Sequence, residues 1–364
     1  MAFRPDLVFV EEPARPYPLT ARILKRLAGV PVEVVPAADR AVERIRTAND
    51  PIGRGKRALL LAVHPGRFIK PCPCTPDHIG CGYFIINLHL NCPLDCSYCI
   101  LQGYLSNPLL TVHVNLDDLW TELDAFLSTT GRQRPVRIGT GELADSLALD
   151  PIAGSSLDLI QHFRGRPEAV LELKTKTGEV DLILRAEPAD NVVVSWSLNT
   201  PQAARTEEGG AASIEERLEA AAAVVRRGFR VGFHFDPLLR FSDWRRDYGR
   251  VVRDLFRAVA PGSVAWISLG SLRFPPALKP IVQRRFPSTR ILAEELIRGR
   301  DGKFRYFRPL RVELYRALLD EIRTAAGGAV PVYLCMESAE VWKDVLKKNP
   351  GGKAAVASFL SPRR

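Results

Sequence analysis

Three cysteines, Cys92, Cys96 and Cys99, form a C-x3-C-x2-C motif directly after the apolar run Tyr83–Leu90. Three thiolates on one short loop can hold three irons of a [4Fe–4S] cube and leave the fourth iron open to a small molecule. Zinc and plain buried thiols are the alternatives. Zinc usually takes four closed ligands, often as C-x2-C pairs, so the spacing favours an iron–sulfur cluster.

Four further cysteines lie outside this motif. Cys72, Cys74 and Cys81 precede the same apolar run, and Cys335 lies near the C-terminus. Clustered cysteines in a chain of 364 residues indicate metal binding or catalysis rather than a disulfide framework. We interpret the four either as inert thiols or as ligands of an auxiliary iron–sulfur cluster.

The charge and composition limit the class of protein. Lys and Arg number 51 against 41 Asp and Glu, so the net charge is +10, which favours polyanionic partners such as nucleic acid. An Arg-rich composition is the alternative explanation.

The 46% hydrophobic and 25% charged residues are ordinary for a globular protein and exclude collagen, coiled coils and disordered tails. No apolar run approaches the ~20 residues of a membrane helix and no secretory signal is visible. We therefore expect a cytoplasmic protein without a membrane partner.

Apolar runs alternate with helical patterns after residue 80. The expected strands are Tyr83–Leu90, Pro135–Gly139, Ala169–Leu173, Val192–Leu198, Val231–Phe235 and Val264–Leu269. The expected helices are Asp117–Leu127, Leu157–Phe163, Val180–Ala186, Ile214–Arg227 and Tyr248–Val259. This order predicts an α/β fold with a parallel sheet and right-handed crossovers. Six units are too few for a closed eight-fold barrel, so we expect a TIM-like partial (β/α)6 barrel with its chemistry beyond the C-terminal ends of the strands.

Three parts are expected along the chain. Residues 1–80 form an N-terminal α/β lead, residues 81–275 the partial barrel, and residues 276–364 a C-terminal extension with a basic hairpin and a closing β/α unit. The expected elements of the two outer parts are helix Leu19–Leu27, strands Val30–Val35 and Ala58–Val63, helix Val312–Ala325, strand Val330–Leu334 and helix Ala339–Lys347. The clearest local signal is the capping box from Ser213 to Glu216, which predicts a helix that Gly228 ends.

The cysteine motif, with Tyr98 before Cys99, resembles that of the radical S-adenosylmethionine (SAM) superfamily. The segment from Cys92 to Leu105, the preceding Cys81-Gly-Tyr83 and the start from Tyr17 to Leu27 resemble the spore photoproduct lyase family of DNA repair enzymes. The resemblance implies reductive cleavage of SAM at a [4Fe–4S] cluster to a 5′-deoxyadenosyl radical, which abstracts hydrogen from a thymine-dimer-type DNA lesion. It also implies an electron donor such as flavodoxin or ferredoxin. The alternatives are a radical SAM enzyme acting on RNA, protein or a metabolite, and a non-catalytic iron–sulfur or zinc protein that binds nucleic acid.

The resemblance also implies roles for single residues. Cys92, Cys96 and Cys99 match the cluster ligands. Tyr98 matches a tyrosine near the thiol relay of the family, although a ring packed beside the cluster is the alternative. The matches to SAM-binding positions are Gly139, Thr140, Gly141, Glu142, Lys176, Ser197 and Asn199. Asp236 and His234 share one strand face and either reach the SAM ribose or the substrate, or form a structural pair.

Glu142 marks the main departure from the family. By its spacing from the cluster motif and from Asp145, it falls where the family has its hydrogen-donating cysteine. A carboxyl O–H is a poor hydrogen-atom donor. We therefore hypothesise that Cys81 or Cys335 supplies the missing thiol.

The segment 298–311 interleaves basic and aromatic residues around Asp301-Gly302, a dipeptide typical of hairpin turns. Basic side chains can follow phosphates and aromatic rings can stack on bases. In the family that this sequence resembles, a hairpin near this position engages the lesion. A charged edge hairpin is the alternative. The candidate nucleic-acid residues are Arg298, Arg300, Lys303, Arg305, Tyr306 and Arg308.

Overall fold

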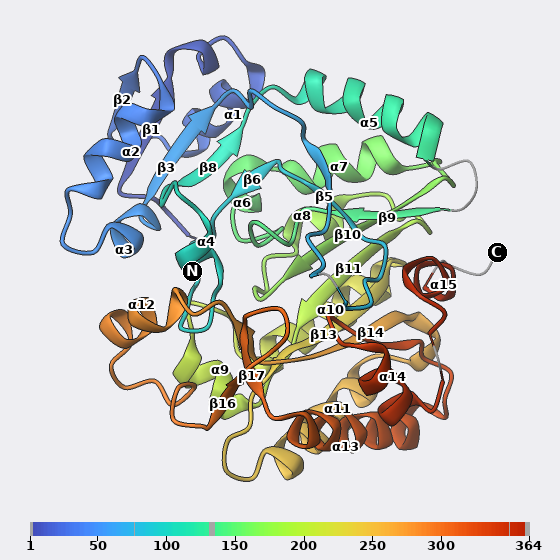
Figure 1. Ribbon diagram of the computed structural model, residues 1–364. Coiled ribbons are helices and arrows are strands. Elements are labelled where there is room, and N and C mark those ends of the chain that lie inside the picture. Colours follow the sequence, from blue (N-terminus) through green and yellow to red (C-terminus); the bar gives the residue numbers. More distant parts are fainter. Residues whose placement is uncertain (1–2, 76, 131–134, 349, 361–364) are drawn as a thin grey trace.

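Two sheets organise the computed structural model, which describes residues 3–75, 77–130, 135–348 and 350–360 (Figure 1). The five-stranded sheet has the order β2-β1-β3-β8-β6, in which only β6 runs antiparallel to its neighbour. Its strands are β1 (Leu7–Glu11), β2 (Val32–Val35), β3 (Ala58–Ala62), β6 (His89–Leu90) and β8 (Leu110–His113). Residues on both sides of the cysteine motif therefore join the sheet of the N-terminal segment. The division at residue 80 remains a prediction.

The eight-stranded sheet is a curled half-barrel with the order β18-β14-β13-β11-β10-β9-β5-β4. Its strands are β4 (Ile69–Pro71), β5 (Phe84–Ile86), β9 (Val136–Gly139), β10 (Ala169–Thr175), β11 (Val192–Ser197), β13 (Arg230–Leu238), β14 (Val264–Ser271) and β18 (Val332–Leu334). All neighbours are parallel except β4 and β5. The expected partial barrel is confirmed, and β4 and β18 extend it beyond the six expected strands.

The expected first barrel strand, Tyr83–Leu90, is divided between the two sheets. Its first half forms β5 of the half-barrel and its second half forms β6 of the five-stranded sheet. Two backbone bonds outside the ladders mark the crossing: Asn87 N donates to Phe68 O at 2.8 Å, and His113 N donates to Leu88 O at 3.0 Å. The alternating apolar pattern could not show this change of partner, because both halves are buried.

Helices cover the outside of the half-barrel (Figure 1). They are α5 (Leu116–Thr130), α7 (Ser155–Phe163), α8 (Asp181–Arg185), α10 (Ile214–Arg227) and α11 (Trp244–Ala258). In contrast, α6 (Asp150–Ala153) packs against the N-terminal segment, and α9 (Pro201–Glu207) lies in a loop after β11. The N-terminal and loop helices are α1 (Pro18–Arg26), α2 (Ala38–Arg46), α3 (Pro51–Gly55), α4 (Leu101–Tyr104) and the single turns at 12–14 and 261–263. The capping box is confirmed, since Ser213 Oγ accepts from Glu216 N and the Glu216 carboxylate accepts from Ser213 N.

Most of the C-terminal region lies against the barrel away from β1–β3 (Figure 1), but its residue Arg285 pairs with Asp50 of the N-terminal segment at 3.1 Å. It contains α12 (Leu278–Arg285), a hairpin of β16 (Leu296–Arg298) and β17 (Phe304–Tyr306) that pairs with β15 (Arg273–Phe274), and α13 (Arg308–Ala326), α14 (Ala339–Leu346) and α15 (Lys353–Phe359). The hairpin is confirmed. No helix among the described residues is long and apolar enough to cross a membrane.

The two free edges of the half-barrel approach each other. Ile79, between β4 and β5, forms an antiparallel bridge with Glu337, which follows β18. Ile79 N donates to Glu337 O at 3.0 Å. We call this contact between residues 72–83 and residues 335–337 the seam.

Candidate active site

The cysteine loop lies between β6 and α4. Cys92 and Cys96 are buried, Cys99 is partly buried, and none of the three is in a disulfide. The buried Lys56 fixes the loop, because its Nζ donates to Cys92 O at 2.8 Å and to Leu94 O at 2.6 Å. Three free thiols on a loop with a fixed backbone are a donor set that fits three irons of a cluster.

Two short strands hold the middle of this loop. β7 (Asp95–Cys96) pairs with β12 (Glu208–Gly209), which follows α9. Burial raises the pKa of the Cys92 thiol to about 12. A metal must therefore displace a proton that this loop otherwise retains.

Tyr98 lies inside a buried charge network beside the loop. Its hydroxyl donates to the carboxylate of Glu208, which also pairs with the fully buried Arg217. Burial, and then the charge of Glu208, raises the pKa of Tyr98 well above its usual value. Lys176 Nζ lies 5.9 Å from the centre of the Tyr98 ring. The network thus fixes Tyr98 as a neutral phenol close to Lys176.

The segment Gly139–Glu142 leaves the end of β9. A Cβ at Gly139 would lie 2.1 Å from Glu172 O, so packing between β9 and β10 already requires glycine there. A Cβ at Gly141 would lie 2.7 Å from Lys174 Cβ. Thr140 Oγ1 donates to Ser146 Oγ at 2.8 Å. The two glycines therefore have a packing reason that is independent of any ligand.

Glu142 forms an ion pair with Lys174 on the neighbouring strand β10. Both side chains retain some exposure, at 33% and 18%. At the position where the sequence predicts that a donor thiol is missing, the structure has an ion pair. A carboxylate with this accessibility can bind an ammonium group.

Asp145 connects the segment after β9 to the end of β10. Its carboxylate accepts from Lys176 N at 2.7 Å and from Thr175 Oγ1 at 2.7 Å. It also accepts from the backbone of Leu147 and Ala148. The structure therefore brings Lys176, Glu142 and the cysteine loop to one mouth of the half-barrel.

Ser197 and Asn199 lie at the end of β11, and both are buried. Ser197 O accepts from Arg217 Nη1 at 2.9 Å. Asn199 Nδ2 donates to Pro237 O, and its Oδ1 accepts from Tyr248 Oη at 2.6 Å. Asn199 thus already has protein partners at its amide nitrogen and oxygen.

Asp236 lies at the end of β13 and binds Arg273 through two hydrogen bonds of 2.9 Å. Arg273 Nη2 also lies 3.5 Å from Cys335 Sγ. Arg273 thus connects Asp236 to Cys335, which lies at the seam. His234 points elsewhere: its Nε2 lies 2.7 Å from Glu172 Oε1, so the predicted pairing of His234 with Asp236 is not formed by direct contact.

Sequence reasoning missed the buried charge inside the half-barrel. Glu172 accepts from Ser195 Oγ at 2.6 Å and from Trp266 Nε1 at 3.0 Å, and its other oxygen lies 3.5 Å from Arg137 Nη2. The Arg137 guanidinium lies 4.1 Å from the centre of the Trp266 ring. These positive and donating groups, above all His234, hold the pKa of Glu172 far below its usual value although burial opposes them. The signal was present: a Glu within the apolar run 169–173 marks a buried partner.

The basic hairpin presents only part of its predicted surface. Arg298, Arg300 and Arg308 are exposed, whereas Arg305 and Tyr306 are buried. Arg305 pairs with Asp301 and donates to Met336 O, and Tyr306 Oη accepts from Arg240 N at 3.1 Å. Lys303 Nζ donates to Thr75 Oγ1 at 3.0 Å. Arg305 and Tyr306 thus have structural partners.

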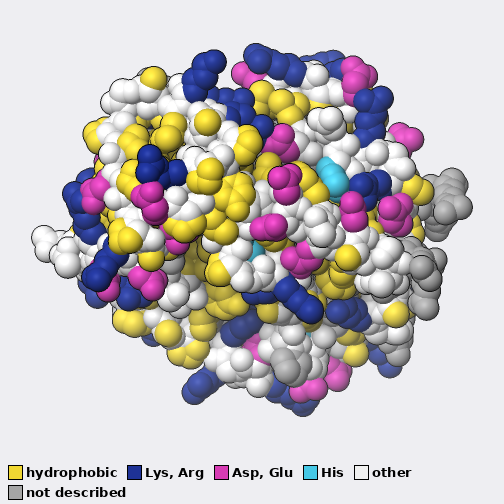
Figure 2. Space-filling model, turned by 90° about the horizontal axis from the view of Figure 1, so that it is seen from above, with side chains coloured by type: hydrophobic (Ala, Val, Ile, Leu, Met, Phe, Trp, Pro, Cys, Tyr) yellow, Lys and Arg dark blue, Asp and Glu magenta, His cyan; other side chains and the backbone are white. Residues whose placement is uncertain are grey.

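The face that carries the N-terminal segment shows no single basic patch. Figure 2 shows Lys and Arg side chains scattered over it among acidic and hydrophobic ones. The exposed arginines of the hairpin remain the predicted location of a nucleic-acid contact.

The family model of spore photoproduct lyase matches residues 3–315. The curated spore photoproduct lyase of a Geobacillus species is 25% identical over 312 residues, covering 84% of this chain and 90% of that protein. The Bacillus subtilis enzyme is 24% identical over 310 residues, covering 83% and 88%.

Solved structures of spore photoproduct lyase have the same fold. A variant with bound SAM and dinucleoside spore photoproduct has a TM-score of 0.78 at 22% identity, covering 93% of this chain and all of that one. A complex with dinucleoside spore photoproduct also reaches 0.78, at 23% identity and with 92% and 100% coverage. Since the family model spans most of the chain, this protein belongs to the spore photoproduct lyase family.

Proposed function

We propose that this chain is a radical SAM enzyme that acts on a thymine-dimer-type photoproduct in DNA. The observation that carries the proposal is the position of three free thiols, Cys92, Cys96 and Cys99, at the mouth of the family's half-barrel. These thiols would hold a [4Fe–4S] cluster, which with SAM supplies a 5′-deoxyadenosyl radical by reductive cleavage.

The residues around the mouth of the barrel have roles that follow from their contacts. Glu142, with its partly exposed carboxylate, would bind the SAM ammonium group, and Lys176 would bind the SAM carboxylate. Ser197, Asn199 and Asp236 line the same mouth at the strand ends. Of these, Asn199 and Asp236 would position neighbouring groups through the bonds that they already make.

An electron donor such as flavodoxin or ferredoxin would dock beside Cys99. Two large hydrophobic side chains follow it and are exposed, Ile100 at 46% and Tyr104 at 60%. An exposed apolar spot next to a partly buried cluster ligand offers a short path for one electron. No charged group blocks this spot among the residues from Ile100 to Tyr104.

A second candidate keeps the radical chemistry on a different substrate. The observation in its favour is the ion pair of Glu142 and Lys174 at the position that corresponds to the family's donor thiol. With Cys81 or Cys335 as donor, the hydrogen would come from the seam instead. Repair of DNA and chemistry on another substrate give different products, so one experiment separates them.

The test is anaerobic turnover of the reduced protein with SAM and UV-damaged DNA, analysed for 5′-deoxyadenosine and repaired thymine. We expect the parent protein to form both 5′-deoxyadenosine and repaired thymine. The control variant Cys99→Ala should form neither product. Formation of 5′-deoxyadenosine without repaired thymine would favour the second candidate. Absence of 5′-deoxyadenosine from iron-loaded protein would contradict radical SAM chemistry.

A further inference from the structure

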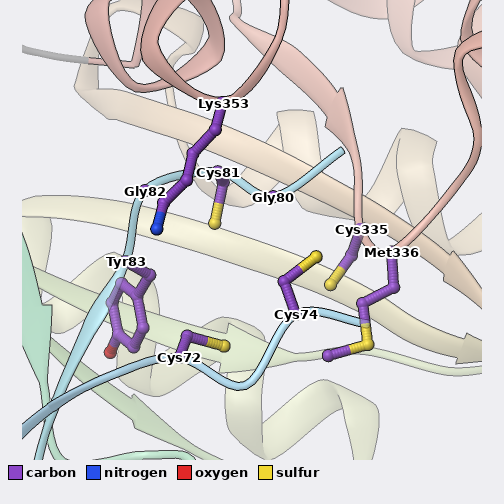
Figure 3. Close-up of a pocket in the computed structure, with 9 residues that line it drawn as sticks. All are labelled: Cys72, Cys74, Gly80, Cys81, Gly82, Tyr83, Cys335, Met336 and Lys353. Carbon is purple, nitrogen blue, oxygen red and sulfur yellow. The ribbon is translucent and has the colours of Figure 1, made fainter. Parts of the chain in front are cut away.

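A small cavity at the seam is lined by all four cysteines outside the C-x3-C-x2-C motif. Its walls are Cys72, Cys74, Cys81 and Cys335, together with Gly80, Gly82, Tyr83, Met336 and Lys353. The thiols come from three chain segments, and Figure 3 shows them around the cavity, with Cys74 and Cys335 directed toward each other. None of the four is in a disulfide.

The four free thiols face one cavity, although they belong to chain segments that are far apart in the sequence. Four thiols around one cavity are as many ligands as a tetrathiolate centre requires.

The seam thiols are not arranged as ligands of a single metal ion. Among the described residues, no group of three or more His, Cys, Asp or Glu side chains is arranged to hold one metal ion. The same result applies to the loop of Cys92, Cys96 and Cys99, on which we expect a four-iron cube. A cube holds each thiolate at its own iron, so the sulfur atoms stand farther apart than around one zinc ion.

Positive groups are placed to balance the charge of such a cluster. The Arg273 guanidinium lies 3.5 Å from Cys335 Sγ, and Lys353 lines the cavity. Hydrogen bonds and charges near the sulfur atoms stabilise thiolate-bound clusters.

Two glycines let the backbone pass close to the atoms around the cavity. A Cβ at Gly80 would lie 3.3 Å from Cys74 Sγ, and one at Gly82 would lie 2.6 Å from Ala357 Cβ in α15. Apart from the bridge at Ile79, residues 72–83 form no regular ladder in the described structure.

We propose that Cys72, Cys74, Cys81 and Cys335 bind a second [4Fe–4S] cluster that closes the seam of the half-barrel. All four ligands are protein thiolates, so the cluster has no open iron and does not bind SAM. It joins the β4–β5 edge to the β18 edge. It also fixes the basic hairpin against the seam. Lys303 of the hairpin donates to Thr75, and Arg305 donates to Met336 O.

The proposal does not depend on the reaction at the Cys92 loop. It competes with the hypothesis that Cys81 or Cys335 donates hydrogen, because a ligated thiolate carries no hydrogen atom. Loss of radical activity would therefore leave it standing, and confirmation would assign the donor elsewhere.

The decisive variant is Cys92→Ala/Cys96→Ala/Cys99→Ala, prepared anaerobically as the full chain and analysed for iron, sulfide, zinc and Mössbauer spectrum. The expected result is about four irons and four sulfides per chain with a cubane spectrum, against about eight irons in the parent. Folding of this variant is checked by circular dichroism, and its seam is untouched.

Two additions in the same background locate the residual iron. Cys74→Ala is expected to remove it, whereas Met336→Leu, which changes a cavity wall without changing a thiol, retains it. A folded triple variant without iron would overturn the proposal. One zinc per chain in place of iron would also overturn it, and so would residual iron that survives Cys74→Ala/Cys335→Ala.

Discussion

The two cysteine sites of this protein are built in opposite ways. Cys92, Cys96 and Cys99 lie on one loop within eight consecutive residues, whereas the seam thiols come from segments that are more than 250 residues apart. The loop has three thiols and fits a cluster with an open iron, and the seam has four and fits a closed one. Ligand number thus separates a site for chemistry from a site that joins two edges of a sheet.

The largest expected effect tests whether the two sites are independent. Cys96→Ala removes a ligand from the loop, so SAM cleavage should fall below detection while the iron of the seam remains. The measurement is 5′-deoxyadenosine formation together with the iron count on the same preparation. If Cys96→Ala emptied both sites, the comparison of two separate centres would be wrong.

The second expected effect concerns how the loop is held. Lys56→Met removes the charged donor to two buried carbonyls, Cys92 O and Leu94 O. Hydrogen bonds to charged groups contribute about 1.5–3 kcal/mol each, so the loop should open more easily. We expect iron to be lost to a chelator roughly tenfold faster or more from the loop, with the slower iron of the seam unchanged.

Lys25→Met on α1 is the matched control for this change, since it also removes a lysine charge. It should leave both rates of iron loss unchanged. Equal acceleration at both sites in Lys56→Met would show general destabilisation rather than a local effect on the loop.

The sequence allowed one of these sites to be predicted with its ligands and the other only as a possibility. The loop could be read because its three thiols are neighbours in the chain and follow one strand. Convergence of Cys335 with Cys72, Cys74 and Cys81 depends on the curl of the half-barrel, which brings Ile79 to Glu337. No local pattern encodes that long-range contact.

The same distinction holds for the fold and for the candidate residues. The helix Ile214–Arg227 was predictable to the residue because its capping box and Gly228 are local signals. The division of Tyr83–Leu90 between two sheets was not, because both partners are distant in sequence. Arg305 likewise matched an exposed basic pattern, but it is buried: it pairs with Asp301 in the hairpin turn and donates to Met336 O at the seam.

The third expected effect is a pH dependence of the unfolding free energy that comes from two histidines near the cysteine loop. Burial lowers the pKa of His89 to about 3 and that of His113 to about 4, from 6.5. Both lie in the strands β6 and β8 that flank the loop. The unfolded chain binds these protons first, so their contribution to stability is complete above pH 6.5 and declines as the pH falls toward 4.

His113→Gln should reduce this dependence, because His89 and the other groups with shifted pKa values still contribute to it. Each histidine contributes up to about 1.4 kcal/mol per pH unit to the slope of the unfolding free energy between pH 6.5 and 4. Urea unfolding of the parent and the variant at several pH values measures the slopes. An unchanged slope in His113→Gln would mean that this histidine is protonated in the folded protein.

The smallest expected effect concerns the hairpin, which rests on the seam and not on the loop. Arg298→Ala/Arg300→Ala removes two exposed cations, so DNA affinity should fall severalfold and the slope of log affinity against log salt should decrease by about two. Arg40→Ala on α2, at the N-terminal end of the molecule, is the control and should leave both unchanged. Binding measured at several salt concentrations separates the two results. If the control lowered the slope as much as the hairpin variant, the contact would be spread over the whole basic surface, and the seam would have no part in positioning DNA.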